Sequence, residues 1–203
     1  MATIEKAMTR WMAPAALLGG AVWVLRAVWL SVMPAGCVGA ACSQPGHTTR
    51  DSGLLTPLIA IAVALMAVAV TGLIVQTFQA GRMGRIGRAG VSAVVLAGLE
   101  LGAYGVARAA LHRDLAPLAA MSGPLLVLGI ILTGVALLRA GALHRSAVMA
   151  LMIGSVAMLG YNDQTSQALL AIPFGVAWMV LGLTLLLRTE AEPGSSAEAT
   201  TSG

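Results

Sequence analysis

Charged residues are scarce in this chain. Asp, Glu, Lys and Arg make up 10% of its 203 residues, whereas a soluble globular domain carries about 25%. Apolar residues reach 58%, and the mean hydropathy is +0.88. The composition excludes an ordinary soluble domain. It predicts an all-α integral membrane protein, because the apolar runs are long enough to cross a bilayer as helices.

Lysine is nearly absent, since Lys6 is the one lysine among twelve basic residues and the other eleven are arginine. Together with the excess of Ala, Gly and Val, this usage favours a GC-rich bacterial genome and hence a bacterial plasma (inner) membrane. A net charge of +4 and a pI of 9.8 would suggest a nucleic-acid partner in a soluble chain. In a membrane protein such charges are explained first by orientation, so no nucleic-acid partner is predicted.

Catalytic motifs are also missing. The sequence contains no nucleotide-binding glycine loop, no His-Glu-x-x-His, no Gly-x-Ser-x-Gly and no carboxylate cluster suited to two metals. We therefore predict no cofactor, no metal site and no catalytic residue. Met149, Met152 and Met158 are interpreted as apolar packing rather than as soft-metal ligands.

Six apolar segments separated by short polar gaps predict six transmembrane helices in one membrane domain, residues 1–188. A spanning helix takes about 20 residues. The predicted helices cover residues 11–33, 55–78, 90–111, 118–138, 146–161 and 167–187. Residues 189–203 contain no large apolar side chain and are predicted to form a disordered cytoplasmic tail.

The basic residues predict the orientation, because lysine and arginine concentrate in cytoplasmic loops. With both ends in the cytoplasm, two basic loop residues, Arg50 and Arg113, fall outside, and Arg26 and Arg108 lie within helices. The other eight fall inside: Lys6, Arg10, Arg82, Arg85, Arg88, Arg139, Arg145 and Arg188. This asymmetry supports an even number of spans with cytoplasmic N- and C-termini.

A cleaved signal peptide is the rival interpretation of the first segment. Its apolar stretch runs from Trp11 to Met33, 23 residues, and contains Arg26. A signal peptide has an apolar region of about 7–15 residues. The length therefore favours a membrane helix.

Two of the predicted cytoplasmic turns share a faint sequence repeat. Thr71-Gly72 precedes Ala80-Gly81, and Thr133-Gly134 precedes Ala140-Gly141. Duplication would make helices two and three, and helices four and five, tandem helical hairpins. Convergence on similar turns explains the pattern nearly as well, so both interpretations stay open.

Ionisable residues inside spanning helices are the main candidates for function, because each costs about 2.5–3.5 kcal/mol to insert. Glu100, Tyr104 and Arg108 follow a spacing of four and form one polar stripe on the third helix. Arg26 lies in the outer half of the first helix. Because the first and third helices run in the same direction, Arg26 is the first candidate for the charge partner of Glu100. Arg108, two turns away on the same helix as Glu100 and near enough to the interface to snorkel, is the weaker candidate.

Two readings of this pair remain open. An Arg26–Glu100 pair can simply fix how two helices pack, or it can belong to a ligand or proton site. Trp23 and Trp29 flank Arg26 at three residues on either side, which allows a cation–π contact with Arg26, although interfacial anchoring is the simpler role for Trp29. An intramembrane enzyme using Glu100 as an acid or base is a third and weaker idea, because no nucleophile accompanies it.

The fifth predicted helix is short, and a polar turn follows it. Residues 146–161 would cover about 24 Å, less than the roughly 30 Å hydrocarbon core. Asn162 and Asp163 are therefore predicted to lie in a recessed outer vestibule that also contains Arg26, Tyr104 and Arg108. The alternative is an ordinary polar turn that caps two helices.

Cys37 and Cys42 are the two cysteines of the chain and fall in the longest predicted outer loop. We predict a structural disulfide, because disulfides persist on the non-cytoplasmic side. A redox-active or metal-binding pair, together with His47 or His112, is the alternative. The spacing does not match Cys-x-x-Cys.

From the sequence we predict a non-enzymatic membrane component or accessory subunit, with a membrane-protein partner or a homo-oligomer. The alternative is binding or transport of a small anionic or zwitterionic solute through the outer vestibule. Two arginines against one glutamate would leave that vestibule positively charged. Short loops and the absence of motifs favour the first reading.

Overall fold

A computed structural model describes residues 2–38, 42, 50, 55–79, 81, 84–110, 116–141 and 143–191. The described chain is helical, with α1 (Ala2–Val32), α2 (Leu55–Gln79), α3 (Arg85–Ala110), α4 (Ala116–Ala140), α5 (Arg145–Ala157) and α6 (Ala171–Ala191). Two short 3-10 helices, η2 (Met158–Gly160) and η3 (Ser166–Leu170), connect α5 to α6. Each α-helix overlaps one of the apolar segments of the sequence.

Four helical segments are long and apolar enough to cross a membrane: Arg10–Val32, Leu58–Phe78, Met121–Ala140 and Ser166–Arg188. Arg145–Gly160 forms a shorter apolar helix. Large apolar side chains such as Leu25, Leu99 and Ile153 are more than half exposed. A water-soluble protein rarely exposes so much apolar surface, so the structure is consistent with a helical membrane protein.

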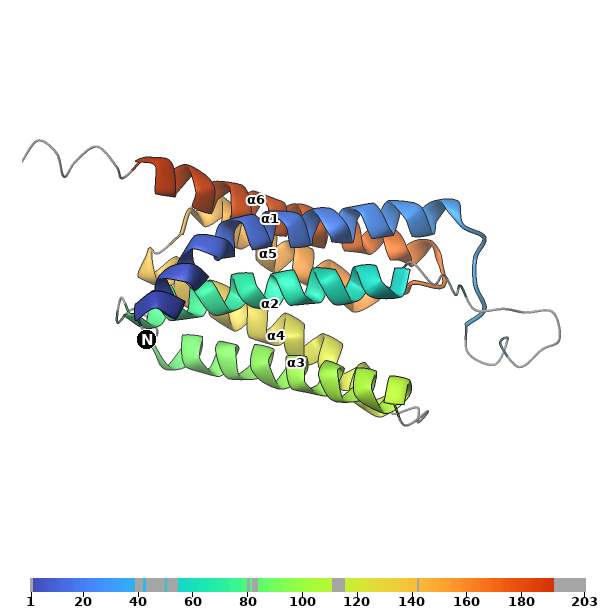
Figure 1. Cartoon of the computed structure of the whole chain (residues 1–203). Helices are drawn as coiled ribbons and strands as arrows, with labels where there is room; N and C mark the ends of the chain where they lie inside the picture. The colour runs from blue at the N-terminus through green and yellow to red at the C-terminus, as the bar shows by residue number, and fades with distance from the viewer. Residues whose placement is uncertain are drawn as a thin grey trace, which may run out of the picture.

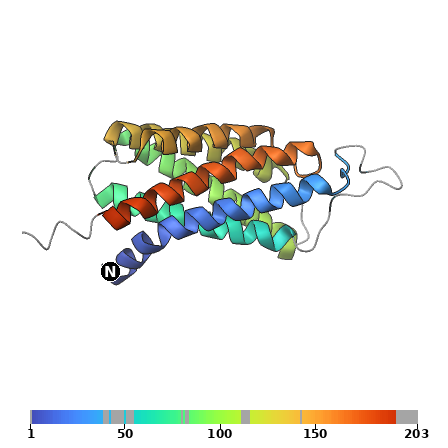
Figure 2. The ribbon, with the colours of Figure 1, turned by 90° about the horizontal axis from the view of Figure 1, so that it is seen from above.

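The helices form an open series of neighbours. α1 packs between α2 and α6, α6 packs on α5, α5 on α4, and α4 on α3. Figures 1 and 2 show these helices running roughly along one direction as an elongated bundle. α2 and α3 are adjacent in sequence, yet each packs mainly on a different neighbour, α2 on α1 and α3 on α4.

The repeated turns share one geometry but do not produce repeated hairpins. Gly81 and Gly141 have φ angles of +63° and +59°, in the left-handed region that favours glycine at a helix end. After each turn the next helix begins with an arginine, Arg85 in α3 and Arg145 in α5. α4 and α5 then pack together, whereas α2 and α3 pack mainly on other helices. The tandem-hairpin prediction is therefore wrong for α2 and α3.

Glycine allows the closest helix contacts. A Cβ atom on Gly20 of α1 would collide with the backbone oxygen of Gly175 in α6 and lie 2.9 Å from the amide nitrogen of Met179. A Cβ atom on Gly90 of α3 would lie 2.6 Å from the backbone nitrogen of Thr133 in α4. Small residues let helix backbones approach in this way where no water drives association.

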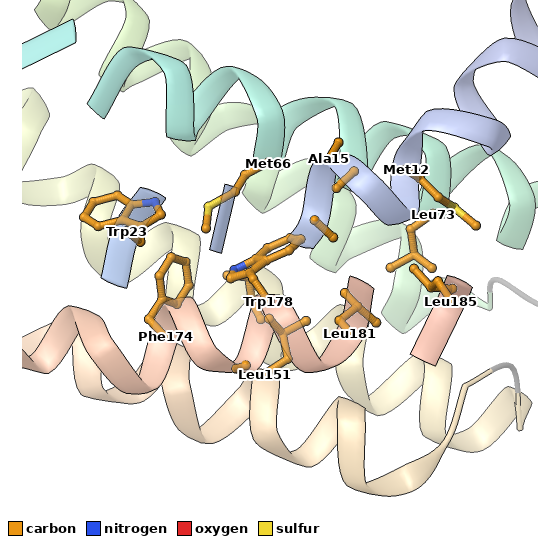
Figure 3. Packing of buried hydrophobic residues seen from close by; sticks show 14 of the residues in the cluster. Met12, Ala15, Trp23, Met66, Leu73, Leu151, Phe174, Trp178, Leu181 and Leu185 are labelled. Carbon is orange, nitrogen blue, oxygen red and sulfur yellow. The ribbon is translucent and has the colours of Figure 1, made fainter. Parts of the chain in front are cut away.

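The core lies where α1, α2, α5 and α6 meet, and Figure 3 shows part of it. Trp23, Phe174 and Trp178 form successive edge-to-face contacts, with ring centroids 5.9 and 6.2 Å apart. Met66 and Leu151 fill the space beside these rings. Aromatic pairs of this geometry favour one packing arrangement over its alternatives.

Several predicted boundaries differ from the structure. α1 begins at Ala2 instead of residue 11, since no glycine or proline interrupts residues 2–10. It contains Pro14, and Figure 1 shows α1 bent in its N-terminal part. α6 continues to Ala191, so the first three residues of the predicted tail are helical, and residues 192–203 lie outside the described residues.

The fifth helix is shorter than predicted. α5 has 13 residues, about 20 Å at 1.5 Å per residue, and its continuation tightens into η2 before Tyr161. Gly160 lies in this segment, and glycine weakens an α-helix. α5 therefore ends early, and the chain continues through η2 and η3, of which η3 packs on α1.

Candidate functional site at the loop end of the bundle

The two ends of the bundle differ in character. We call the end where α1 finishes and where η2 and η3 join α5 to α6 the loop end. We call the opposite end, on the left in Figure 1, the basic end, because the terminal turns of α3, α4, α5 and α6 carry arginine there. These arginines are Arg85, Arg88, Arg139, Arg145 and Arg188.

Arg26 is the centre of the loop end. Its side chain is buried, with 4% of its surface exposed. Nη1 donates a hydrogen bond to the Tyr161 hydroxyl, and Nη2 lies 3.4 Å from Oδ2 of Asp163. The guanidinium carbon is 5.9 Å from the Trp23 ring centroid and 6.0 Å from that of Tyr161. Two aromatic rings and one carboxylate thus surround the charge.

The predicted Arg26–Glu100 pair is wrong. Arg26 pairs with Asp163, and Glu100 lies on α3, which packs on α4 and not along α1. Oε2 of Glu100 is buried and has no hydrogen-bond partner in the part of the chain that the structure describes. Helices running in one direction need not be neighbours, and here α2 and α6 occupy both sides of α1.

Tyr104 and Arg108 lie in α3, but their side chains fall outside the described residues. Gly98, on the same helix, has no atom within 4 Å of an added Cβ. No described part of the chain therefore packs closely against α3 at Gly98.

The polar turn at residues 162–165 contacts α1. Asp163 of this turn lies beside Arg26, with which the sequence analysis grouped it. Asn162 caps the turn, because its Oδ1 accepts a hydrogen bond from the Gln164 amide at 2.9 Å. Asp163 accepts a second bond, 3.1 Å, from the side-chain amide of Gln164. Asp163 reaches Arg26, which lies six residues before the end of α1, or about 9 Å along the helix axis. The turn is therefore set back from the tip of α1.

Arg50 is a central residue that the sequence analysis missed. Its side chain donates to the backbone oxygens of Met33 and Pro34, at 2.9 and 2.6 Å, and to that of Asp163 at 3.0 Å. Its backbone amide donates to Oε1 of Gln164 at 2.6 Å. Arg50 thereby satisfies carbonyls at the end of α1 and ties them to the α5–α6 connection. The one sequence signal was an arginine on the side poor in positive charge.

Cys37 and Cys42 lie at disulfide distance, with Cα atoms 5.0 Å apart, as predicted. The neighbouring amide of Gly36 donates to the backbone oxygen of Gln164 at 2.8 Å. The disulfide ring therefore begins where the chain is already fastened to the α5–α6 connection. His47 and His112, the alternative partners of a metal site, lie outside the described residues.

Burial raises the pKa of the Tyr161 hydroxyl, and the positive charge and hydrogen bond of Arg26 oppose that rise. Asp163 adds a smaller upward contribution to the same pKa. The phenol therefore remains neutral at ordinary pH and acts as a hydrogen-bond acceptor for Arg26. It is not poised as a base.

The described residues contain no group of three or more His, Cys, Asp or Glu side chains that could hold a metal ion. Trp11 and Trp29 are about half exposed, in contrast to the buried Trp23 beside Arg26. The chemistry that the loop end offers is a buried cation matched by a carboxylate. The chain matches no protein-family model, no curated protein and no solved structure.

Proposed function

We propose that this protein is a non-enzymatic component of a bacterial plasma membrane, with six spans and both ends in the cytoplasm, that serves as an accessory subunit or scaffold. One observation carries the proposal: the buried charge of Arg26 is matched within the chain by Asp163 and Tyr161. The pair connects α1 to the turn between α5 and α6. Its role is architectural.

The energetics favour this role. A buried ion needs both a counter-charge and hydrogen bonds to offset its lost hydration. Arg26 obtains both from a single five-residue turn, and Arg50 fastens the same turn to the end of α1. A charge held in this way favours one arrangement of helices.

The arrangement of arginines supports the proposed orientation. Arginines gather at the terminal turns of the basic end, while Arg26 and Arg50 lie at the loop end, where both contact Asp163. Cytoplasmic enrichment of arginine would place the basic end inside the cell. Any even number of crossings places both chain ends there, and the six apolar segments of the sequence lead us to propose six.

Solute binding at the loop end is the competing proposal, and one observation favours it. Nε of Arg26 and Nε1 of Trp23 are buried donors with no hydrogen-bond partner among the described residues. A small anion or zwitterion could accept from such donors. Asp163 weakens this reading, because it cancels the positive charge that would attract the solute.

A double-mutant cycle separates the two. Asp163→Leu leaves Arg26 buried without a counter-charge and should lower the free energy of unfolding by about 3 kcal/mol. Arg26→Leu combined with Asp163→Leu should recover most of that loss, because an apolar pair needs no compensation. Thermal unfolding in one detergent measures all the variants. Wild-type stability of Asp163→Leu alone would refute the architectural role.

Native mass spectrometry of the protein extracted from its own membrane tests the wider proposal. We expect a stoichiometric protein complex that the Arg26→Leu/Asp163→Leu variant retains. A bare chain carrying a small molecule that this variant loses would instead establish solute binding. The same preparations serve both measurements.

A further inference from the structure

An apolar cleft lies between α2 and α3. Leu73 and Ile74 of α2 form one wall, Val91 and Val94 of α3 form the other, and α4 forms the floor. Leu151 of α5 and Trp178 of α6 also line the cleft, so its inner end reaches the core. Figure 1 shows α4 behind the space between α2 and α3. These two helices pack mainly on other neighbours, so the cleft is open between them to the side of the bundle.

The cleft is narrow and apolar. Its volume is about 30 Å³, and the atoms exposed to it are apolar. A space of this size is enough for one or two water molecules, but an apolar cavity stays dry. Among helices of membrane-spanning length, the medium that reaches a lateral apolar cleft is a hydrocarbon chain.

Positive charge lies at one mouth of the cleft. The walls come from the last turns of α2 and the first turns of α3, so the cleft lies toward the basic end. Arg88 precedes Val91 by three residues, which places both on neighbouring positions of one helix face. Arg88 is exposed, and neither it nor Arg85 has an acidic partner among the described residues.

We infer that the α2–α3 cleft binds an anionic phospholipid, with an acyl chain between the helices and its phosphate at Arg88. Basic groups beside a cleft between membrane helices are a recognised way to bind anionic headgroups. A guanidinium pairs well with a phosphate, because its donors match two phosphate oxygens. The inference requires that the helices lie in a bilayer and is independent of the role of Arg26.

Lipid titration of the delipidated full-length protein tests the inference. Phosphatidylglycerol and phosphatidylcholine with identical acyl chains are added in turn, and bound lipid is counted by native mass spectrometry. We expect one phosphatidylglycerol to bind more tightly than phosphatidylcholine. Arg88→Ala should weaken phosphatidylglycerol binding about fivefold, the effect of roughly one membrane-surface arginine. Phosphatidylcholine binding should change little.

Matched controls locate the site. Arg145→Ala removes an arginine from the same end of the bundle, on α5, and should keep wild-type affinity. Ile74→Trp fills the cleft and should abolish binding of both lipids, whereas Ile153→Trp adds the same bulk at an exposed position of α5 and should not.

Two results would overturn the inference. Equal binding of both lipids would show that the net negative charge of the headgroup plays no role, since both lipids carry a phosphate and only phosphatidylcholine carries a compensating cation. Unchanged phosphatidylglycerol binding in both Arg88→Ala and Ile74→Trp would place the lipid elsewhere. If Ile74→Trp does not fold, Arg88→Ala against Arg145→Ala still decides, since both side chains are exposed and unpacked.

Discussion

The loop end and the α2–α3 side of the bundle use arginine in opposite ways. At the loop end, Arg26 and Arg50 bond to groups of the same chain, and together they fasten α1 to the α5–α6 connection. Beside the cleft, Arg85 and Arg88 are exposed and have no acidic partner among the described residues. Within the bundle a charge must be matched by the protein, whereas at the membrane surface it can be matched by lipid.

The same contrast holds for the backbone. Around α1 and α6 the helices approach until Gly20 and Gly175 touch, and the packing leaves no room for a methyl group. The outward side of α3 is open, with Gly98 facing empty space. We therefore expect substitutions to be costly along α1 and α6 and inexpensive on the exposed side of α3.

Gly20→Ala should have a large effect in this comparison. The new Cβ would collide with backbone atoms of α6, which cannot move aside as a side chain can. We expect unfolding to become easier by about 2 kcal/mol, as for other overpacked sites. Gly98→Ala is the matched control and should be neutral or stabilising. Thermal unfolding of both variants decides, and equal losses would show that the α1–α6 contact is not tight.

Arg50→Ala should have a smaller and more local effect. Removing the side chain frees the carbonyls of Met33, Pro34 and Asp163, and nearby water partly replaces the lost bonds. We expect a loss of about 1 kcal/mol. Hydrogen exchange at the Gly36 amide, which bonds to Gln164, should accelerate, while exchange in α3 stays unchanged.

Arg50→Lys sharpens this test. Lysine keeps the charge but cannot donate in several fixed directions at once. Exchange at Gly36 should therefore resemble that of Arg50→Ala. Slow, wild-type exchange in Arg50→Lys would mean that charge alone holds the loop end together.

Hydropathy and turn residues locate the helices approximately, because long apolar segments and left-handed glycines act locally, but the ends are less well predicted: α1 begins at Ala2 and α5 ends at Ala157. Hydropathy and turn residues were not sufficient to place helices beside one another. In a bilayer all sides of a helix can be apolar, so hydrophobic periodicity does not reveal which neighbour a side faces. The sequence therefore predicts Glu100 as the partner of Arg26, whereas in the structure Arg26 pairs with Asp163.

Arg50 could not be predicted for a related reason. Its partners are backbone carbonyls at the end of α1 and in the turn after α5, and a carbonyl is present at every position of a sequence. Only the fold shows which of them lack a helical partner. The sequence shows that Arg26 lies within a membrane helix and needs partners. The groups that hold the loop end together can be identified only from the tertiary structure.

Glu100→Gln should have the smallest effect. A glutamate paired with Arg26 would cost about 3–5 kcal/mol on neutralisation, but Glu100 has no described partner to lose. We expect the free energy of unfolding to change by less than about 0.5 kcal/mol. An increase in the free energy of unfolding would also agree with the structure, since an unpaired carboxyl group is unfavourable within a membrane helix. Thermal unfolding beside Asp163→Leu measures the difference directly. If Glu100→Gln were as damaging as Asp163→Leu, both carboxyls would be coupled to buried positive charge, and the separation of α3 from the loop end would fail.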